Sequence, residues 1–202
     1  MPTIPIRQSC RNRAAFSLIE AMVAISIAAV AGSVMLLGVT TSIQTTNEAM
    51  ERTIAAGIAR QLMDEIVGGR YAAKGVDGYQ INFGPSAWEQ VGSGRQRYDD
   101  IDDYHGLQTQ PPEDPNGILL GTDDGEGGQR HINLQAPTGF LDDWSEEVDV
   151  RYVDESDLST PLPHGSTSDY RTVEVSVYKD DPEGGRRELA KLKRVVAYVP
   201  PM

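Results

Sequence analysis

Residues 16–39 read FSLIEAMVAISIAAVAGSVMLLGV, and this stretch decides how the rest of the chain is arranged. Among its 24 residues the only ionisable side chain is that of Glu20. A helix rises about 1.5 Å per residue, so a run of this length crosses the roughly 30 Å hydrocarbon core of a bilayer. The stretch therefore predicts one membrane-spanning helix near the N-terminus.

Basic residues flank this apolar run on one side only. Arg7, Arg11 and Arg13 precede it, which predicts that the N-terminus stays in the cytoplasm and the remainder lies outside. An ordinary signal peptide or signal anchor would explain the length and the arginines. It would not explain Glu20, because a charge near a membrane centre costs roughly 2.5 kcal/mol or more and usually has a specific partner.

The ten residues 11–20, RNRAAFSLIE, resemble the class III signal of type IV prepilins. In that signal a short basic leader ends in a small residue before a phenylalanine, and a glutamate stands fifth after the cleavage site. The family normally has glycine before that site, whereas this chain has Ala15. The resemblance implies cleavage between Ala15 and Phe16 by a prepilin peptidase and methylase, with N-methylation of Phe16.

Glu20 has a physical role in such a protein. When subunits stack in a filament core, its carboxylate can pair with the positive N-terminal amine of a neighbouring Phe16. Because a buried charge pair is costly to mispair and adds little net stability, it sets the register of the subunits. We therefore assign Glu20 to subunit register, and we assign Ala15 and Phe16 to processing.

The sequence beyond the apolar run continues as an amphipathic helix. Apolar residues recur at spacings of four and seven, and charged residues stand between them, up to Gly68-Gly69, where we expect the helix to end. The apolar positions are Ile43, Met50, Ile54, Ile58, Leu62 and Ile66. We predict four parts: a leader (1–15), a transmembrane or filament-core helix (16–39), an amphipathic helix (40–69) and a loop-rich β head (70–202).

The head divides into two patterns. Residues 70–133 are rich in Gly, Asp, Gln and Pro and predict long loops with scattered short strands. From Glu147 onward, valines alternate with polar residues in two runs, and residues 189–199 supply a returning strand. We predict an α+β fold in which the long N-terminal helix packs on a C-terminal antiparallel sheet, which is a pilin-like architecture.

An acidic segment, residues 98–106 (YDDIDDYHG), stands out in the loop region. It resembles a segment of minor prepilins of the mannose-sensitive-haemagglutinin type. Its four aspartates can supply the oxygen ligands that calcium takes, although they lack the spacing of an EF-hand. The alternative is a solvated turn. The four residues are Asp99, Asp100, Asp102 and Asp103.

Composition and motifs limit the other functions. The net charge is −12, and because three arginines precede the apolar run, the rest of the chain carries −15, which disfavours nucleic-acid binding through a basic surface. The only cysteine, Cys10, lies in the predicted leader. Three widely spaced histidines form no metal motif, and no nucleotide-binding or hydrolase motif is present. Trp88 and Trp144 are expected to serve packing first. We expect no enzyme and, calcium aside, no cofactor.

These patterns predict a structural subunit, a minor pilin or pseudopilin, in a type IV pilus or type II secretion-like filament. Its partners would be the prepilin peptidase, other pilin subunits and the bacterial inner membrane, with the head outside the cytoplasm and later in a periplasmic or surface filament. Pilus, secretion and DNA-uptake machineries share this N-terminus. Two alternatives stay open: a membrane-tethered binding module that does not polymerise, and an exported hydrolase on a signal anchor.

Overall fold

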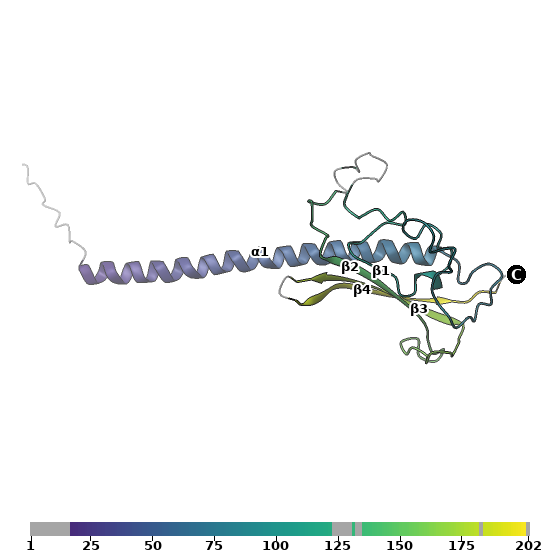
Figure 1. The fold of residues 1–202 in the computed structure, drawn as a ribbon. Helices are drawn as coiled ribbons and strands as arrows, with labels where there is room; N and C mark the ends of the chain where they lie inside the picture. Colours follow the sequence, from purple (N-terminus) through teal and green to yellow (C-terminus); the bar gives the residue numbers. More distant parts are fainter. Residues whose placement is uncertain (1–16, 123–130, 132–134, 182–183, 201–202) are drawn as a thin grey trace, which may run out of the picture. The chain divides into compact units, whose positions relative to one another are not determined.

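The computed structural model describes residues 17–122, 131, 135–181 and 184–200. Its elements are α1 (Leu18–Gly68), the short 3-10 helix η1 (Asp102–Tyr104), β1 (Gln108–Thr109), β2 (Trp144–Tyr152), β3 (Tyr170–Asp180) and β4 (Arg186–Ala197), shown in Figure 1. The chain divides into two compact units between Glu48 and Ala49, and α1 contributes to both.

The first unit contains the N-terminal part of α1. Every described residue from Ser17 to Glu48 is exposed, including the large apolar side chains of the predicted membrane span. In the described part of the chain, α1 is the one helix long and apolar enough to cross a membrane. Side chains this apolar need a cover of lipid or of other apolar helices, because exposed they would cost about 25 cal/mol for each Å² of apolar surface.

The second unit is an α+β head, which confirms the predicted fold. Residues 49–68 of α1 bury one face, and the buried positions recur every three or four residues as an amphipathic helix requires. They join the valines of the sheet in a single core, and Figure 1 shows this part of α1 lying along the sheet. The buried helix residues are Ala55, Ile58, Ala59, Leu62, Met63 and Ile66.

The sheet is antiparallel throughout, with strand order β1-β2-β3-β4. Val150 lies opposite Val173 and Val148 opposite Val175, so the alternating valines of β2 and β3 share the face that meets α1. The odd-numbered neighbours on β2, such as Asp149, point to the other, polar face. The period-two pattern in the sequence thus records which face of the sheet is buried.

Two sets of ion pairs fix α1 to the rest of the head. Near its start in this unit, Glu51 is 2.5 Å from the Lys179 ammonium and 2.6 Å from the Arg187 guanidinium, which joins the helix to β3 and β4. Since both partners favour the ionised form, these contacts lower the pKa of Glu51 even though its partial burial acts in the opposite direction. The pairs fix the position of the helix along the sheet.

A buried network serves the same purpose near the end of α1. The Arg95 guanidinium binds Glu65 of α1 through two hydrogen bonds of 2.7 and 3.0 Å, and it lies 3.5 Å from Glu146 of β2. Thr109 of β1 donates a further hydrogen bond of 2.9 Å to Glu146. One arginine in a loop thereby connects the helix, the sheet and the loop region.

The loop that carries Arg95 is held by a contact between two glycines. Gly94 and Gly117 both have positive φ, +63° and +76°, and a Cβ added to Gly94 would lie 2.2 Å from the backbone nitrogen of Gly117. No side chain fits between the two backbones, so glycine is required there. The glycine-rich composition of this region therefore serves close packing of loops.

Candidate functional site

Glu20 lies in the first turn of α1. Its backbone N–H donates a hydrogen bond of 3.3 Å to the Ser17 hydroxyl oxygen, so Ser17 caps the helix and Glu20 stands three residues after the cap. The neighbouring Leu18 and Ile19 are 81 % and 71 % exposed. Within the described residues, the Glu20 carboxylate has no basic partner. The role of Glu20 in subunit register therefore stays a prediction.

The two residues assigned to processing, Ala15 and Phe16, lie outside the described residues. Cleavage between them and methylation of Phe16 therefore stay predictions. The helix that follows begins at Leu18, only two residues beyond the predicted cleavage site.

The acidic segment, residues 98–106, forms η1 and the turns around it. Asp100 accepts hydrogen bonds of 3.0 and 3.2 Å from the backbone N–H groups of Asp102 and Asp103. Asp103 in turn accepts bonds of 2.9 and 3.3 Å from the backbone N–H groups of Asp99 and Asp100. These two carboxylates satisfy the free N–H groups of a short helical turn, which is the usual task of aspartate at such positions.

Asp102 has a different partner, the guanidinium of Arg171 on β3. The two charged groups are 3.0 Å apart and both are almost completely buried, and the Gln80 amide also donates a hydrogen bond to Asp102. The guanidinium lies 4.3 Å from the centre of the Tyr71 ring and donates to the Tyr152 hydroxyl at 2.9 Å. This buried charge pair fixes the acidic segment on the sheet.

The remaining residues of the acidic segment join the helix to the sheet. The Tyr104 hydroxyl donates to Glu65 of α1 at 2.9 Å, and His105 accepts a bond of 3.2 Å from the backbone N–H of Val150 on β2. The Gly106 N–H donates to the Val148 carbonyl at 3.0 Å. The segment therefore acts as a structural connection in the head.

Burial changes the protonation of these carboxyl groups. It raises the pKa of Asp100 to about 7, with a further contribution from the neighbouring Asp102. Burial also raises the pKa of Asp103 to about 6, against the lowering effect of its backbone hydrogen bonds. Asp102, which faces Arg171, is best suited to carry the negative charge, and Asp100 is best suited to hold the proton.

This arrangement predicts how stability depends on pH. Because Asp100 and Asp103 bind protons more strongly in the folded state than in the unfolded state, where carboxyl pKa values are about 4, the free energy of unfolding should fall as pH rises from 4 to 7. Thermal unfolding of the full chain in detergent between pH 4 and 8 measures this slope.

Asp100→Asn tests the assignment of that slope. The asparagine amide can donate to Asp102 as the protonated acid does, and its carbonyl can still accept the backbone N–H groups. The variant should match the wild type near pH 4 and lose less stability as pH rises. A slope identical to that of the wild type would show that the Asp100 proton does not control it.

The structure separates the four predicted calcium ligands. Asp99 and Asp103 come together with Glu89, and one oxygen of each of these three carboxylates lies within 4.8 Å of the others. Asp99 is also 2.7 Å from the Arg70 guanidinium, while Asp100 and Asp102 are engaged as described above. Calcium would have to compete with these hydrogen bonds and ion pairs, and its binding stays a prediction.

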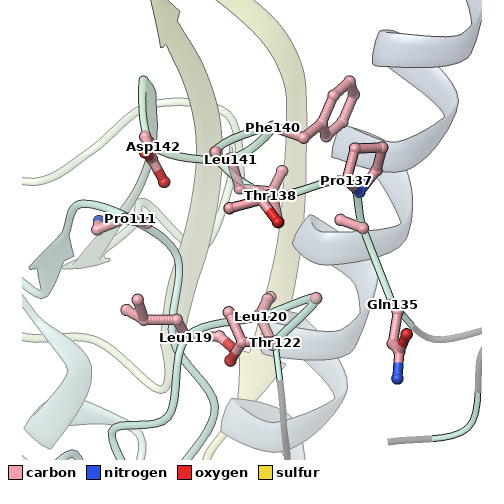
Figure 2. A pocket seen from close by; sticks show the side chains of 13 residues that line it. Pro111, Leu119, Leu120, Thr122, Gln135, Pro137, Thr138, Phe140, Leu141 and Asp142 are labelled. Carbon is pink, nitrogen blue, oxygen red and sulfur yellow. The ribbon is translucent and has the colours of Figure 1, made fainter.

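A hollow of about 450 Å³ lies between the loop that contains Leu119 and the loop before β2, as Figure 2 shows. Its walls are largely apolar and include Leu119, Pro137 and Phe140. Asp142 is the one ionisable side chain among the described residues that line it. The described residues of this lining thus offer no pair of titratable groups for acid–base chemistry.

The tryptophans and the histidines described below lie at separate positions in the head and do not form one site. Trp144 is fully buried in the core, as expected for a packing residue, whereas Trp88 is 66 % exposed and has the Arg97 guanidinium 4.8 Å from its ring centre. His105 bonds to β2, and His164 lines a separate hollow beside Tyr152. The metal-capable cluster found among the described residues contains no histidine.

Sequence reasoning missed Arg171 and Glu146, the charged residues at the centre of the head. Both occupy inward positions of their strands: Arg171 shares the odd-numbered face of β3 with Val173, and Glu146 shares the even-numbered face of β2 with Val148. A charged residue in phase with the inward valines of a strand predicts a buried charge with a buried partner. The alternating pattern of the sequence could therefore have identified both residues.

Comparison with known proteins gives one positive result. The family model described as the prokaryotic N-terminal methylation motif matches residues 10–36. No curated protein matches the chain, and no solved structure matches it. The matched stretch covers the predicted cleavage site, Glu20 and most of the apolar run 16–39. Residues 10–36 are therefore a prokaryotic N-terminal methylation motif, the class III signal of type IV prepilins.

Proposed function

We propose that this chain is a structural subunit, a minor pilin or pseudopilin, of a type IV pilus or type II secretion-like filament. The observation that carries the proposal is Glu20, the one ionisable residue in the apolar run, placed in the first helical turn without a partner in the described part of the chain. The methylation motif and the fold of a long apolar helix with an α+β head support the same function.

The proposed function implies an order of steps: membrane insertion, cleavage and methylation, and then assembly. The chain inserts in the inner membrane with its arginines in the cytoplasm, and a prepilin peptidase cleaves it after Ala15 and methylates Phe16. Lateral packing of the apolar helices then replaces lipid by neighbouring subunits. The exposed apolar side chains of α1 are covered first by lipid and then by other subunits.

Mass spectrometry of the N-terminus tests the processing step. The chain purified from cells that express a prepilin peptidase should begin at Phe16 and carry one additional methyl group. In cells without the peptidase it should keep its arginine-containing leader. A mature chain that begins at any other residue would remove the main support for the proposal.

The two alternative functions make different predictions. A tethered binding module or an exported hydrolase uses the helix only as an anchor, so neither needs Glu20. The loss of assembly in a Glu20 variant, with membrane insertion intact, therefore separates a filament subunit from both alternatives.

A further inference from the structure

The face of α1 that lies away from its own sheet carries a shallow hollow between two arginines. Arg52 and Arg60 stand eight residues apart, and the small residues Thr53, Ala56 and Gly57 lie between them. The hollow measures about 420 Å³. A Cβ added at Gly57 would meet nothing within 4 Å, so the floor of the hollow is open. We call these five residues the arginine notch.

The two arginines of the notch are unusual in their lack of partners. Among the basic side chains in the described part of the chain, only those of Arg52, Arg60 and Lys74 have no ion pair, hydrogen bond or aromatic contact. Two of these three lie in the notch. On a chain that carries −15 beyond its leader, two free guanidinium groups beside one hollow form a distinct positive site.

Two of the three acidic residues nearest in sequence are already engaged, and the third, Glu48, stands four residues before Arg52, is exposed and forms no ion pair with it. Asp64, one helical turn after Arg60, lies 3.5 Å from Arg194. Glu51, beside Arg52, is held by β3 and β4 through Lys179 and Arg187. None of these three acids forms an ion pair with Arg52 or Arg60, so among the described residues both guanidinium groups are left without an ionic partner.

The same head has carboxylates in surplus. Asp142, Glu155 and Glu188 are exposed, and none of them forms an ion pair with another described residue. One copy of the chain thus presents free arginines on its helix and free carboxylates on its loops and on β4. Pairing between two copies would use both sets, whereas the described residues of one copy do not pair them with each other.

We propose that the arginine notch docks an exposed, unpaired carboxylate of a second copy of this chain, packed beside the first. The inference deepens the proposed function and rests on it, because α1 packs against neighbours only when the apolar segments assemble. Charge complementarity orients such a contact, and the small residues of the notch allow a carboxylate to approach between the two guanidinium groups. Glu20 then sets the axial register, and the notch selects an acidic neighbour.

Carbodiimide coupling identifies the occupant. Arginine does not couple to carboxylates, whereas the amines introduced by Arg52→Lys and Arg60→Lys do, and the charge is preserved. Filaments are assembled from a mixture of isotopically light and heavy chains, coupled, digested and analysed by mass spectrometry. We expect mixed light–heavy peptides that join position 52 or 60 to an Asp or Glu of a second copy, and none at these positions in the wild type.

Other coupling results overturn the proposal. Peptides that join position 52 or 60 only to a different protein would exclude a second copy as the occupant. Filaments that form normally but yield no intermolecular peptide at either position would exclude the notch as a docking surface. Failure of even the wild-type chain to enter filaments would reject the proposed function itself, and the notch with it.

Charge reversal provides an independent measurement. Arg60→Glu should lower the filament-associated fraction about tenfold, because juxtaposed like charges are strongly unfavourable at an interface. The matched control is Lys74→Glu, which makes the same change at an unpaired cation outside the notch and should leave assembly unchanged. The melting temperature of both variants should equal that of the wild type, since both residues are exposed and unpaired. Equal assembly of both variants would overturn the inference.

Discussion

Replacing Glu20 by alanine is expected to lower the filament-associated fraction of the chain about a hundredfold, which corresponds to about 3 kcal/mol per subunit. The reason is that the amine of a neighbouring Phe16 would be left unpaired in the apolar core of the filament. Membrane insertion should not decrease, because the substitution removes the only charge from the apolar run. Fractionation into membrane and sheared-filament pools, quantified by immunoblot, measures both effects.

Two further variants separate charge from shape. Glu20→Gln keeps the size and hydrogen-bonding capacity of the side chain but not its charge, so it should fail to assemble almost as completely as the alanine variant. Ser26→Ala removes another polar group of the same helix, one that bonds only to the Met22 carbonyl of its own chain at 2.9 Å, and it should assemble normally. Normal assembly of Glu20→Ala would reject the register role.

The second large effect is expected from Asp102→Asn. The substitution leaves the Arg171 guanidinium, which is completely buried, without its negative partner. Loss of one partner of a buried pair costs about 3 kcal/mol or more, so the melting temperature of the head should fall by roughly 10 °C. Circular dichroism of the full chain in detergent, recorded at pH 7 during heating, measures the change.

Asp99→Asn is the matched control for that experiment. It makes the same chemical change three residues earlier, where the ion pair with Arg70 is about half exposed and is worth at most about 1 kcal/mol. A loss of stability no larger than that of this control would show that the Asp102–Arg171 pair does not stabilise the head. Adding Arg171→Met to Asp102→Asn should restore part of the stability, since it removes the unpaired charge.

The sequence was informative where structure follows from local patterns. The apolar run and the amphipathic spacing predicted one long helix ending near Gly68, and the alternating valines predicted the antiparallel sheet, because these periods reflect which side chains are buried. The lone acid in the apolar run was equally visible. Its assignment to subunit register stays a prediction.

The loop region was much less predictable, because its order comes from contacts between distant residues. Asp102 and Arg171 are 69 positions apart, and no local pattern indicates which of four neighbouring aspartates Arg171 selects. The contact of Gly94 with Gly117 likewise depends on how two loops cross. Strand β1 has two residues and helix η1 has three, and elements this short show no periodic spacing of apolar residues in the sequence. The sequence therefore marked the acidic segment as distinctive, but it did not predict which partner each of its four aspartates binds.

Strand β4 is the last strand of the sheet, and one of its edges faces no other strand of the described chain. The backbone groups on the free edge of this twelve-residue strand could pair with another sheet, which leads to aggregation. Lysines and arginines at five of these twelve positions oppose such pairing. In the proposed filament subunit, we expect this charged edge to disfavour edge-to-edge pairing between the heads of neighbouring chains.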